Sequence, residues 1–287
     1  TTRLAFVTYE YPPFVYGGAG TYASSMVRAL ACIGVEVHVV CPGPGGAVAG
    51  GDGVTVHRIP SGGIGVLRIP RFWFGIWRRF SKIARDAGGF DAVIGNGFSV
   101  LPLKGQKLDC PLVTVMHQSA RDVIRILRPS VTERLRNIGN ELGAAPLFDP
   151  ALVRRADHLV AVSGYVKGAL MRDYGVCDGG ITVIPNGFDD KAVALAPGEY
   201  ETLEGQTGSS GKKKLLFVGR PADKRKGLSD LIDALALVKG NPVLLVAGKG
   251  DTSCLAKRAA RAGVADSVRF LGFVDDGELS RLYAFFD

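Results

Sequence analysis

Cysteine pairs, long apolar runs and repeats are missing from this chain of 287 residues, and each shortage excludes a class of protein. The five cysteines are far apart and have no paired spacing, which argues against a disulfide framework or a zinc site and fits a reducing cytosol. No apolar run approaches the roughly 18 residues that a membrane-spanning helix needs. The first apolar run, Leu4 to Thr8, follows no basic segment, so we expect no secretory leader.

The composition is that of a folded protein. Apolar residues make up 47% of the chain and charged residues 22%, which is enough apolar material for a core and excludes disorder of the whole chain. The 39 glycines follow no three-residue period, so a collagen-like protein is excluded as well. The length favours two domains.

The net charge is +8, and the whole excess lies in one stretch. Residues 51–136 contain 14 basic and six acidic residues, whereas the charges cancel before and after that stretch. A local excess predicts a surface for an anionic partner, namely phospholipid, a phosphorylated acceptor or nucleic acid. The remaining residues carry no basic excess and no recognised nucleic-acid motif, so no nucleic acid is expected as a partner.

Short apolar runs alternate with helical patterns along nearly the whole chain. This alternation predicts an α/β protein with doubly wound parallel sheets. The expected strands are 4–8, 35–41, 54–59, 92–95, 112–116, 159–162, 181–184, 214–218, 243–247 and 268–271. The expected helices are 22–33, 71–85, 120–140 with a break or kink at Pro129, 163–174, 228–238, 254–262 and 277–286.

A change of composition marks the expected domain boundary. Residues 189–211 are rich in glycine, serine and glutamate and show no apolar period, which is typical of a linker. We therefore expect a Rossmann-like domain over residues 1–188, a linker over 189–211, and a second, partly present Rossmann-like domain over 212–287.

In the first domain, Gly17 and Gly18 stand between the first strand and the first helix. Open parallel sheets bind ligands beyond the carboxyl ends of their strands, and the unpaired N–H groups at a helix start suit phosphate. The spacing is not that of the dinucleotide fingerprint. A loop without a ligand stays open as the alternative.

In the second domain, Gly219 and Arg220 follow a strand, Lys226 comes shortly after, and Gly248 follows the next strand. Cations just beyond a strand end predict a diphosphate site. A solvated run of charges is the alternative.

A series of segments along nearly the whole chain carries a family resemblance. In chain order they are Glu10 to Pro13 with Gly17 and Gly18, Val113 to His117, Ser163, Ile184 to Asp189, Phe217 to Arg220 with Lys226 and Gly227, Val246 to Gly250, and Phe270 to Val274. In this order they resemble the retaining nucleotide-sugar glycosyltransferases of the GT-B fold, the family that includes glycogen and sucrose-phosphate synthases. Each segment alone does not indicate a family, whereas the complete series in this order indicates this one.

The resemblance implies an enzyme that transfers a sugar from a nucleoside-diphosphate donor to a hydroxyl acceptor with retention of configuration. It implies that the first domain serves the acceptor and the second binds the donor. His117 would contact the donor sugar, and Arg220 and Lys226 would neutralise the leaving diphosphate; without the resemblance, His117 would be taken as a core histidine. The donor-binding residues implied are Gly17, Gly18, Asn186, Gly219, Gly248, Phe273 and Val274. No metal or other cofactor is implied, because cationic side chains can stabilise the phosphate and the nucleotide sugar is a substrate.

The sequence departs from the family in one respect. The family's pair of glutamates in the second domain would begin just beyond Asp287. Glu133 and Glu141 have the same spacing, but they lie in the first domain without the glycine-rich context, and we interpret them as a coincidence. We expect this chain to be an inactive truncated form with an uncovered apolar face on its last helix. A non-catalytic nucleotide-sugar or phosphate-binding module is the alternative function.

The segment from Arg68 to Phe80 contains both tryptophans among arginines. Aromatic residues beside cations are typical of an interfacial helix on anionic lipid. The alternative is an ordinary core face, since Phe72, Ile76 and Phe80 are four residues apart. We expect a cytoplasmic protein that can lie at the membrane periphery. The candidate residues for a membrane or acceptor surface are Arg71, Trp73, Trp77, Arg78, Arg79, Arg121 and Arg125.

Overall fold

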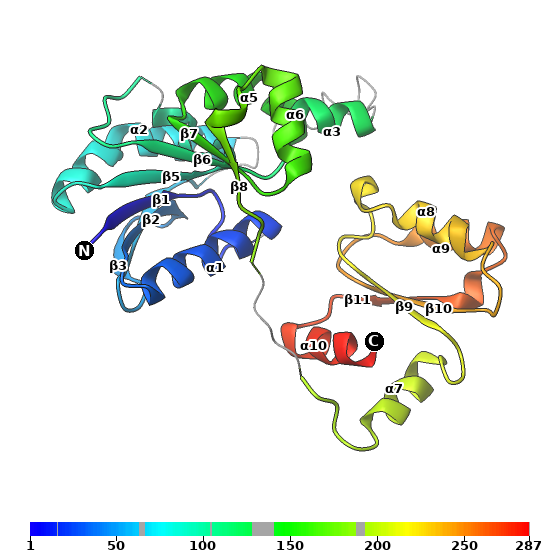
Figure 1. Cartoon of the computed structure of the whole chain (residues 1–287). Helices are drawn as coiled ribbons and strands as arrows, with labels where there is room; N and C mark the ends of the chain where they lie inside the picture. Colours follow the sequence, from blue (N-terminus) through cyan, green and yellow to red (C-terminus); the bar gives the residue numbers. More distant parts are fainter. Residues whose placement is uncertain (16, 63–66, 104, 128–140, 188–192, 287) are drawn as a thin grey trace. The chain divides into compact units, whose positions relative to one another are not determined.

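The computed structural model describes the chain except residues 16, 63–66, 104, 128–140, 188–192 and 287, and except the side chains of 127 and 141–147. The described residues form two compact units, Thr1–Asp189 and Asp190–Asp287 (Figure 1). Each unit is a parallel α/β layer structure with its own core, and each is described by itself.

The first unit is built on an eight-stranded sheet with the order β3-β4-β2-β1-β5-β6-β7-β8. Neighbouring strands are parallel, except that β3 pairs antiparallel with β4. The strands are β1 (Arg3–Val7), β2 (Glu36–Gly43), β3 (Gly46–Ala49), β4 (Val54–Pro60), β5 (Ala92–Asn96), β6 (Leu112–Met116), β7 (His158–Ala161) and β8 (Ile181–Val183).

Helices cover both faces of this sheet (Figure 1). On β1, Phe6 packs on one face with Val27 of a helix, whereas Ala5 and Val7 pack on the other face with Phe72 of a second helix. A strand that is buried on both faces carries a continuous apolar run, which is why β1 and β2 could be predicted from sequence. The described helices are α1 (Gly18–Cys32), α2 (Arg68–Asp86), η2 (Gly97–Leu103), α3 (Ala120–Leu127), α5 (Glu141–Arg155), α6 (Gly164–Tyr174) and η3 (Asp178–Gly180).

The strand order reverses direction between β1 and β5. From β1 the chain builds outward through β2 and β4, and it then returns to add β5, β6, β7 and β8 on the other side. The loops after β1 and β5 therefore diverge at the carboxyl edge of the sheet. Such a switch point is where open α/β sheets bind their ligands.

The second unit has a three-stranded parallel sheet with the order β11-β10-β9. Helices α8 and α9 cover one face, and α10 covers the other (Figure 1). The central strand β10 is buried along its whole length. The elements are α7 (Glu199–Thr207), β9 (Lys214–Val218), η4 (Lys224–Lys226), α8 (Leu228–Leu235), β10 (Val243–Ala247), α9 (Ser253–Arg261), η5 (Ala265–Ser267), β11 (Val268–Gly272) and α10 (Asp276–Phe285).

Helix α7 lies within residues 189–211, where the composition predicts only a linker. Its helical state depends on contacts that are distant in sequence. The ring of Tyr200 packs on Phe285 of α10 with centroids 5.1 Å apart, and Lys214 of β9 pairs with Glu204 at 2.9 Å. These contacts also show that the expectation of an uncovered apolar face on α10 is wrong. Phe285 is buried beneath α7, and Leu282 is buried against the sheet.

Two further elements differ from the sequence prediction. Residues 141–155 form α5 despite Pro146 and Pro150, which weaken the helical pattern. Strand β3 is exposed throughout and glycine-rich at its start, so it lacks an apolar signal. The predicted helix over 120–140 is observed as α3 up to Leu127, and its remainder, including Pro129, lies outside the described residues.

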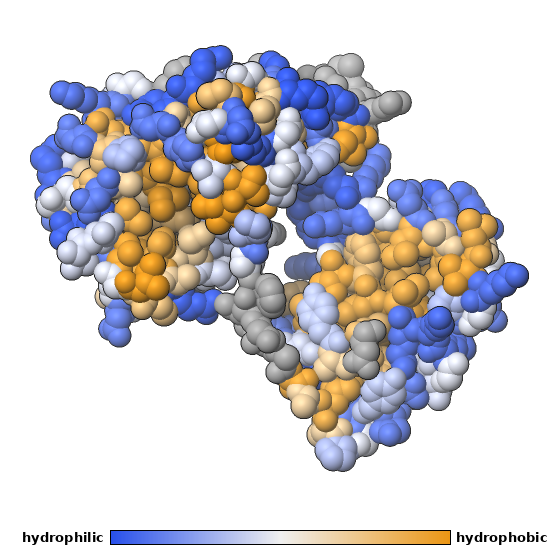
Figure 2. All heavy atoms as spheres, viewed as in Figure 1, coloured by the Kyte–Doolittle hydropathy of each residue, from blue (hydrophilic) through white to orange (hydrophobic). Residues whose placement is uncertain are grey.

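Hydrophobic side chains also reach the surface. Figure 2 shows apolar atoms gathered on the visible face of the second unit. Leu215 and Val218 of β9 are among the exposed apolar residues of this unit. Within the described part of the chain, no helix is both long enough and apolar enough to cross a bilayer.

Candidate functional site

The three strands of the second unit end in glycines that form a compact backbone edge. The N–H of Gly219 after β9 donates to the carbonyl of Ala247 at 3.0 Å, and the N–H of Gly248 after β10 donates to the carbonyl of Gly272 at 2.7 Å. The sheet hydrogen bonding thus continues one residue past β9 and one residue past β10. The loops that follow all leave from the same edge.

Glycine is required at the centre of this edge. A Cβ atom at Gly248 would lie 1.7 Å from the carbonyl oxygen of Gly219, and its φ of +154° is itself rare for other residues. The loop after β10 can therefore lie directly against the loop after β9. A ligand at this edge would meet backbone rather than bulky side chains.

Two cations lie at the start of the loop after β9. Arg220 follows Gly219 directly, and the Cδ atom of Lys226 lies 3.9 Å from the position of a Cβ at Gly219. Asp223 organises this loop, because its carboxylate accepts from Arg225 at 2.9 and 2.7 Å and from Arg220 at 3.1 Å. The hydrogen bond from Arg225 lowers the pKa of Asp223, so this carboxylate stays ionised and orients both guanidinium groups.

Two of the predicted donor-binding residues, Phe273 and Val274, have different environments. Phe273 follows β11 and is 74% exposed, whereas Val274 packs beside Leu216 against the core under the sheet. The structure thus leaves Phe273 available for contact with a planar ligand and gives Val274 a packing role.

In the first unit, the loop after β1 is closed by one carboxylate. The N–H of Gly17 donates to Oε2 of Glu10 at 2.9 Å, and a Cβ at Gly20 would lie 2.9 Å from that oxygen. At Gly17 and Gly18 a Cβ would meet no atom within 4 Å, so the start of α1 borders open space.

His117 and the glycine loop are connected through Asn96, which sequence reasoning missed. The Nδ2 of Asn96 donates to the hydroxyl of Thr8 at 3.0 Å and to the carbonyl of Ala19 at 3.1 Å. Its Oδ1 lies 2.7 Å from Nε2 of His117. Asn96 thereby ties together the ends of β1 and β5, the first turn of α1 and the residue after β6.

These contacts determine the tautomer of His117. The carbonyl of Ala19 can only accept, so the amide nitrogen of Asn96 must face it and Oδ1 must accept from Nε2–H of His117. Burial lowers the pKa of His117, and the ring packs edge-on against Tyr22 at 4.9 Å. The imidazole is therefore neutral at neutral pH, and its Nδ1 is the atom that would accept a hydrogen bond from a ligand hydroxyl.

The remaining predicted site residues lie elsewhere. Asn186 is exposed three residues after β8. Of the two glutamates with the family spacing, Glu133 lies outside the described residues, and Glu141 begins α5 without a described side chain.

Arg121 and Arg125 of α3 have partners within the first unit. Arg125 pairs with Asp122 at 2.9 Å and with Asp173 at 2.8 Å, and Arg121 donates to the backbone carbonyl of Asp173 at 2.6 Å while stacking on Tyr174. Burial acts to raise the pKa of Asp173, but its hydrogen bonds, including that from Arg125, hold it below the ordinary value. These arginines therefore fasten α3 to α6.

Helix α2 separates its aromatic residues into an inner and an outer set. The inner set, which makes the predicted core face, is completely or almost completely buried: Phe72, Ile76 and Phe80. Trp73 belongs to the inner side as well, since its ring packs against Phe148 at 4.9 Å. Trp77 is 56% exposed, and Arg71, Arg78 and Arg79 are exposed as well.

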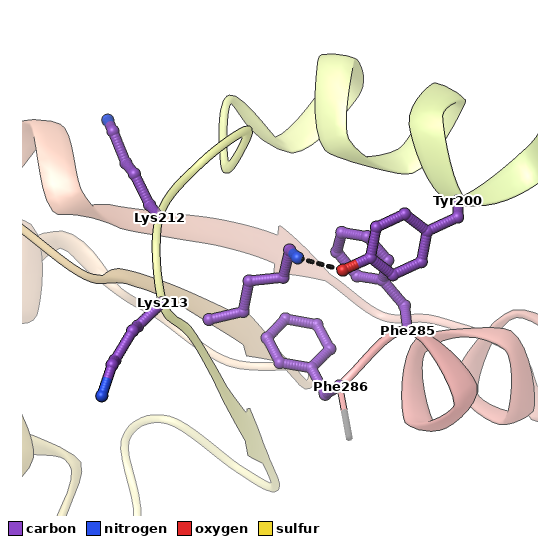
Figure 3. A pocket seen from close by; sticks show the side chains of 6 residues that line it. Tyr200, Lys212, Lys213, Phe285 and Phe286 are labelled. Atoms are coloured by element: carbon purple, nitrogen blue, oxygen red, sulfur yellow. Dashed lines mark hydrogen bonds between the residues drawn. The ribbon is translucent and has the colours of Figure 1, made fainter.

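A hollow of about 300 Å³ lies at the amino end of β9, opposite the glycine edge (Figure 3). The charge of Lys214, which lines this hollow, is balanced within the second unit. Its ammonium group donates to the hydroxyl of Tyr200 at 2.5 Å and pairs with the carboxylate of Glu204. Figure 3 shows Lys212 and Lys213 extending away from the aromatic rings. The hollow is a packing feature between α7 and α10 and contains none of the predicted donor residues.

The signal that could have located Asn96 and Asp223 is their position. Asn96 is a polar residue at the carboxyl end of a buried strand, and Asp223 lies in the loop that follows another strand. Within the part of the chain that the structure describes, no three His, Cys, Asp or Glu side chains gather in a way that could hold a metal ion.

Comparison with known families agrees with this arrangement. The model of "Glycosyltransferase Family 4" matches residues 16–192, and that of "Glycosyl transferases group 1" matches residues 200–286. The first match covers more than half of the sequence. The chain belongs to this glycosyltransferase family.

Curated relatives are enzymes of sugar transfer. Glycogen synthase of Mycobacterium tuberculosis is 27% identical over 98% of this chain and 70% of its own length. Alpha-maltose-1-phosphate synthase of Mycolicibacterium smegmatis is 28% identical over 91% of this chain and 64% of its length. D-inositol 3-phosphate glycosyltransferase of Nocardiopsis dassonvillei is 30% identical over 88% of this chain and 63% of its length. The chain thus spans about two thirds of these relatives.

Solved structures show the same fold. Sucrose-phosphate synthase from Thermosynechococcus elongatus has a TM-score of 0.72 at 18% identity, covering 99% of this chain and 74% of its own. Anabaena HepE in complex with UDP and glucose has a TM-score of 0.63 at 20% identity, covering 99% and 72%. The catalytic domain of Arabidopsis thaliana starch synthase IV bound to ADP and acarbose has a TM-score of 0.63 at 15% identity, covering 99% of this chain and 76% of its own. The protein has the GT-B fold.

Proposed function

We propose that this chain binds a nucleoside-diphosphate sugar for a reaction that transfers the sugar to a hydroxyl acceptor with retention of configuration. The observation that carries the proposal is the glycine edge of the second unit with Arg220 and Lys226 beside it. The proposal is supported by relatives that are named as sugar-transferring enzymes and by fold neighbours that hold UDP or ADP.

The chemistry of the proposed reaction needs positive charge at the diphosphate. Cleavage of the bond between sugar and diphosphate leaves negative charge on the leaving group and positive charge on the sugar. Preorganised donors aimed at the leaving group lower such a barrier by about 3 kcal/mol each. Arg220, Lys226 and the N–H groups of the glycine edge are the donors that we assign to this role.

In the first unit we assign His117 to the transferred sugar. A neutral ring whose Nε2–H is held by Asn96 presents Nδ1 to a sugar hydroxyl without adding charge. Gly17 and Gly18 leave room for the ligand at the start of α1. The acceptor is a hydroxyl compound, and no protein metal or other cofactor takes part in the proposed step.

Calorimetric titration with UDP, ADP and GDP tests the donor site. Replacing Arg220 by alanine should weaken binding of the preferred diphosphate by about 1.5–3 kcal/mol, the range for a hydrogen bond to a charged group. Arg261→Ala is the matched control, because it removes the same charge from the C-terminal end of α9 before β11. Equal affinity of wild type and Arg220→Ala would remove Arg220 from the site.

Turnover with a panel of nucleotide sugars tests the reaction itself. Proton NMR of the product reports the anomeric configuration, and inversion would contradict the retaining mechanism. Tight diphosphate binding without turnover in this chain would instead support the alternative, a non-catalytic nucleotide-sugar-binding module.

A further inference from the structure

The outer face of α2 carries an aromatic pair that the core does not use. Phe74 and Trp77 are 57% and 56% exposed, and their rings stack on each other with centroids 6.0 Å apart and an interplanar angle of 21°. The helix is already anchored by Phe72 and Ile76 on its inner face. The pair therefore adds little to the packing of the first unit, and exposed apolar groups of this size are typical of interaction surfaces.

Cations lie on the same helix as this pair. The guanidinium of Arg78 lies 5.8 Å from the centre of the Phe74 ring, and Arg71, Arg79 and Arg85 are exposed on the same helix. The acidic residue on α2, Asp86, is paired with Lys82 at 2.6 Å. The outer face of α2 thus combines large aromatic rings with a strong local positive charge, in the stretch that holds the entire charge excess of the chain.

We propose that the outer face of α2, formed by Arg71, Phe74, Trp77, Arg78 and Arg85, docks on an anionic membrane surface. Aromatic rings enter the boundary between headgroups and acyl chains, while arginine side chains extend to the lipid phosphates. A nucleic acid would also meet the charge, but proteins that bind single strands set their aromatic rings along a charged groove, whereas Phe74 and Trp77 lie on a convex helix and stack on each other. The membrane is therefore the partner whose chemistry matches both parts of the surface.

Sedimentation with phosphatidylcholine vesicles that contain an increasing share of phosphatidylglycerol tests the proposal. Binding of the full chain should rise with the anionic lipid, and Arg78→Glu with Arg85→Glu should weaken it at least about tenfold, since each basic residue near such a surface contributes about a factor of five. Phe74→Ser with Trp77→Ser should weaken it by a similar factor. All four positions are exposed, so the thermal unfolding midpoint of the variants should stay at that of the wild type.

Matched controls lie in the second unit. Lys239→Glu with Arg261→Glu makes the same charge change, and Leu237→Ser with Tyr283→Ser removes exposed apolar side chains, and both should leave vesicle binding unchanged. The tryptophans give a direct readout. In Trp73→Phe, the emission of the remaining Trp77 should shift to shorter wavelength on anionic vesicles, whereas in Trp77→Phe the emission of Trp73 should not shift.

Equal binding to neutral and anionic vesicles would overturn the proposal, as would absence of binding to either. Binding that the α2 variants leave unchanged would overturn it as well. Salt-sensitive binding to RNA or DNA without vesicle binding, lost in the arginine variant, would assign this face to nucleic acid instead.

Discussion

Asn96 is the residue on which the candidate site of the first unit depends. It makes three hydrogen bonds to groups from separate elements, and it holds the ring of His117 in one tautomer. The sequence shows only a polar residue after a short apolar run. A role of this kind arises when the topology brings the ends of β1, β5 and β6 together.

Gly248 plays a comparable part in the second unit, because its position leaves no room for a side chain. Gly248→Ala should lower the free energy of unfolding by about 3 kcal/mol or more, since the loop after β9 must move away and φ becomes strained. Urea unfolding measures the change. Gly205→Ala is the control, because Gly205 lies in α7 with open space around it, and this change should add up to about 1 kcal/mol of stability. A Gly248→Ala protein as stable as wild type would contradict the close approach of the two loops.

At the scale of elements, strands β2 and β4 share a pair of histidines. Nδ1 of His38 lies 2.9 Å from Nε2 of His57, and Nε2 of His38 lies 2.9 Å from Oε1 of Glu36. Burial lowers the pKa of His57, and the neighbouring His38 lowers it further, while Asp86 acts weakly in the opposite direction. A proton on His57 is therefore held less well in the folded chain than in the unfolded chain.

The sign of the pH effect follows from this difference. Below the ordinary histidine pKa of about 6.5 the unfolded chain binds more protons, so the free energy of unfolding should fall as the pH drops through that value. His117 should contribute in the same direction, because its pKa is also lowered. Urea unfolding at about pH 7.5 and about pH 5.5 should show this loss of free energy of unfolding, and the loss should be smaller in His57→Gln.

An NMR titration of the His57 ring protons in the wild type is the independent check. The histidine pair would not be the cause of the acid sensitivity if His57 titrated at or above the ordinary histidine pKa. The same conclusion would follow if His57→Gln lost as much free energy of unfolding at low pH as the wild type.

Helix α2 shows how an element with a single sequence pattern serves two surfaces. Its spacing of apolar residues places Phe72 and Ile76 in the core, whereas Phe74 and Trp77 project outward. Consecutive residues differ by about 100° around a helix, so Trp73 packs against Phe148 while its neighbour Phe74 projects outward.

At the scale of the whole molecule, each unit contains complete core clusters of its own. The clusters around β1, β2 and β7 consist of residues of the first unit, and those around β10 consist of residues of the second. Residues 1–189 should therefore fold without the rest of the chain and give a cooperative urea transition by circular dichroism.

A fragment of residues 1–157 is the matched control. It lacks β7 and β8, so Met116 and its neighbours on β6 would lose the apolar side chains that cover them. This fragment should show no cooperative transition. Failure of residues 1–189 to unfold cooperatively would mean that the first unit requires the second for its stability.

The alternation of strands and helices and the glycine loops were determined by the sequence itself. Strands such as β1, β6 and β10 carry continuous apolar runs because both of their faces are covered, and this signal is local. The positions of Gly219, Arg220 and Gly248 after strand ends follow from the same signal. The family resemblance rests on these residues, and the family match agrees with it.

Only the tertiary structure decided the rest. Helix α7 is held by Tyr200 against Phe285 and by Glu204 against Lys214, contacts between residues that are distant in sequence. The junction of Asn96 with His117 and the pairing of Arg125 with Asp173 likewise depend on where separate elements meet. Periodicity reports which face of an element is buried but not which polar group it will meet, and that partner is set by the packing of the complete unit.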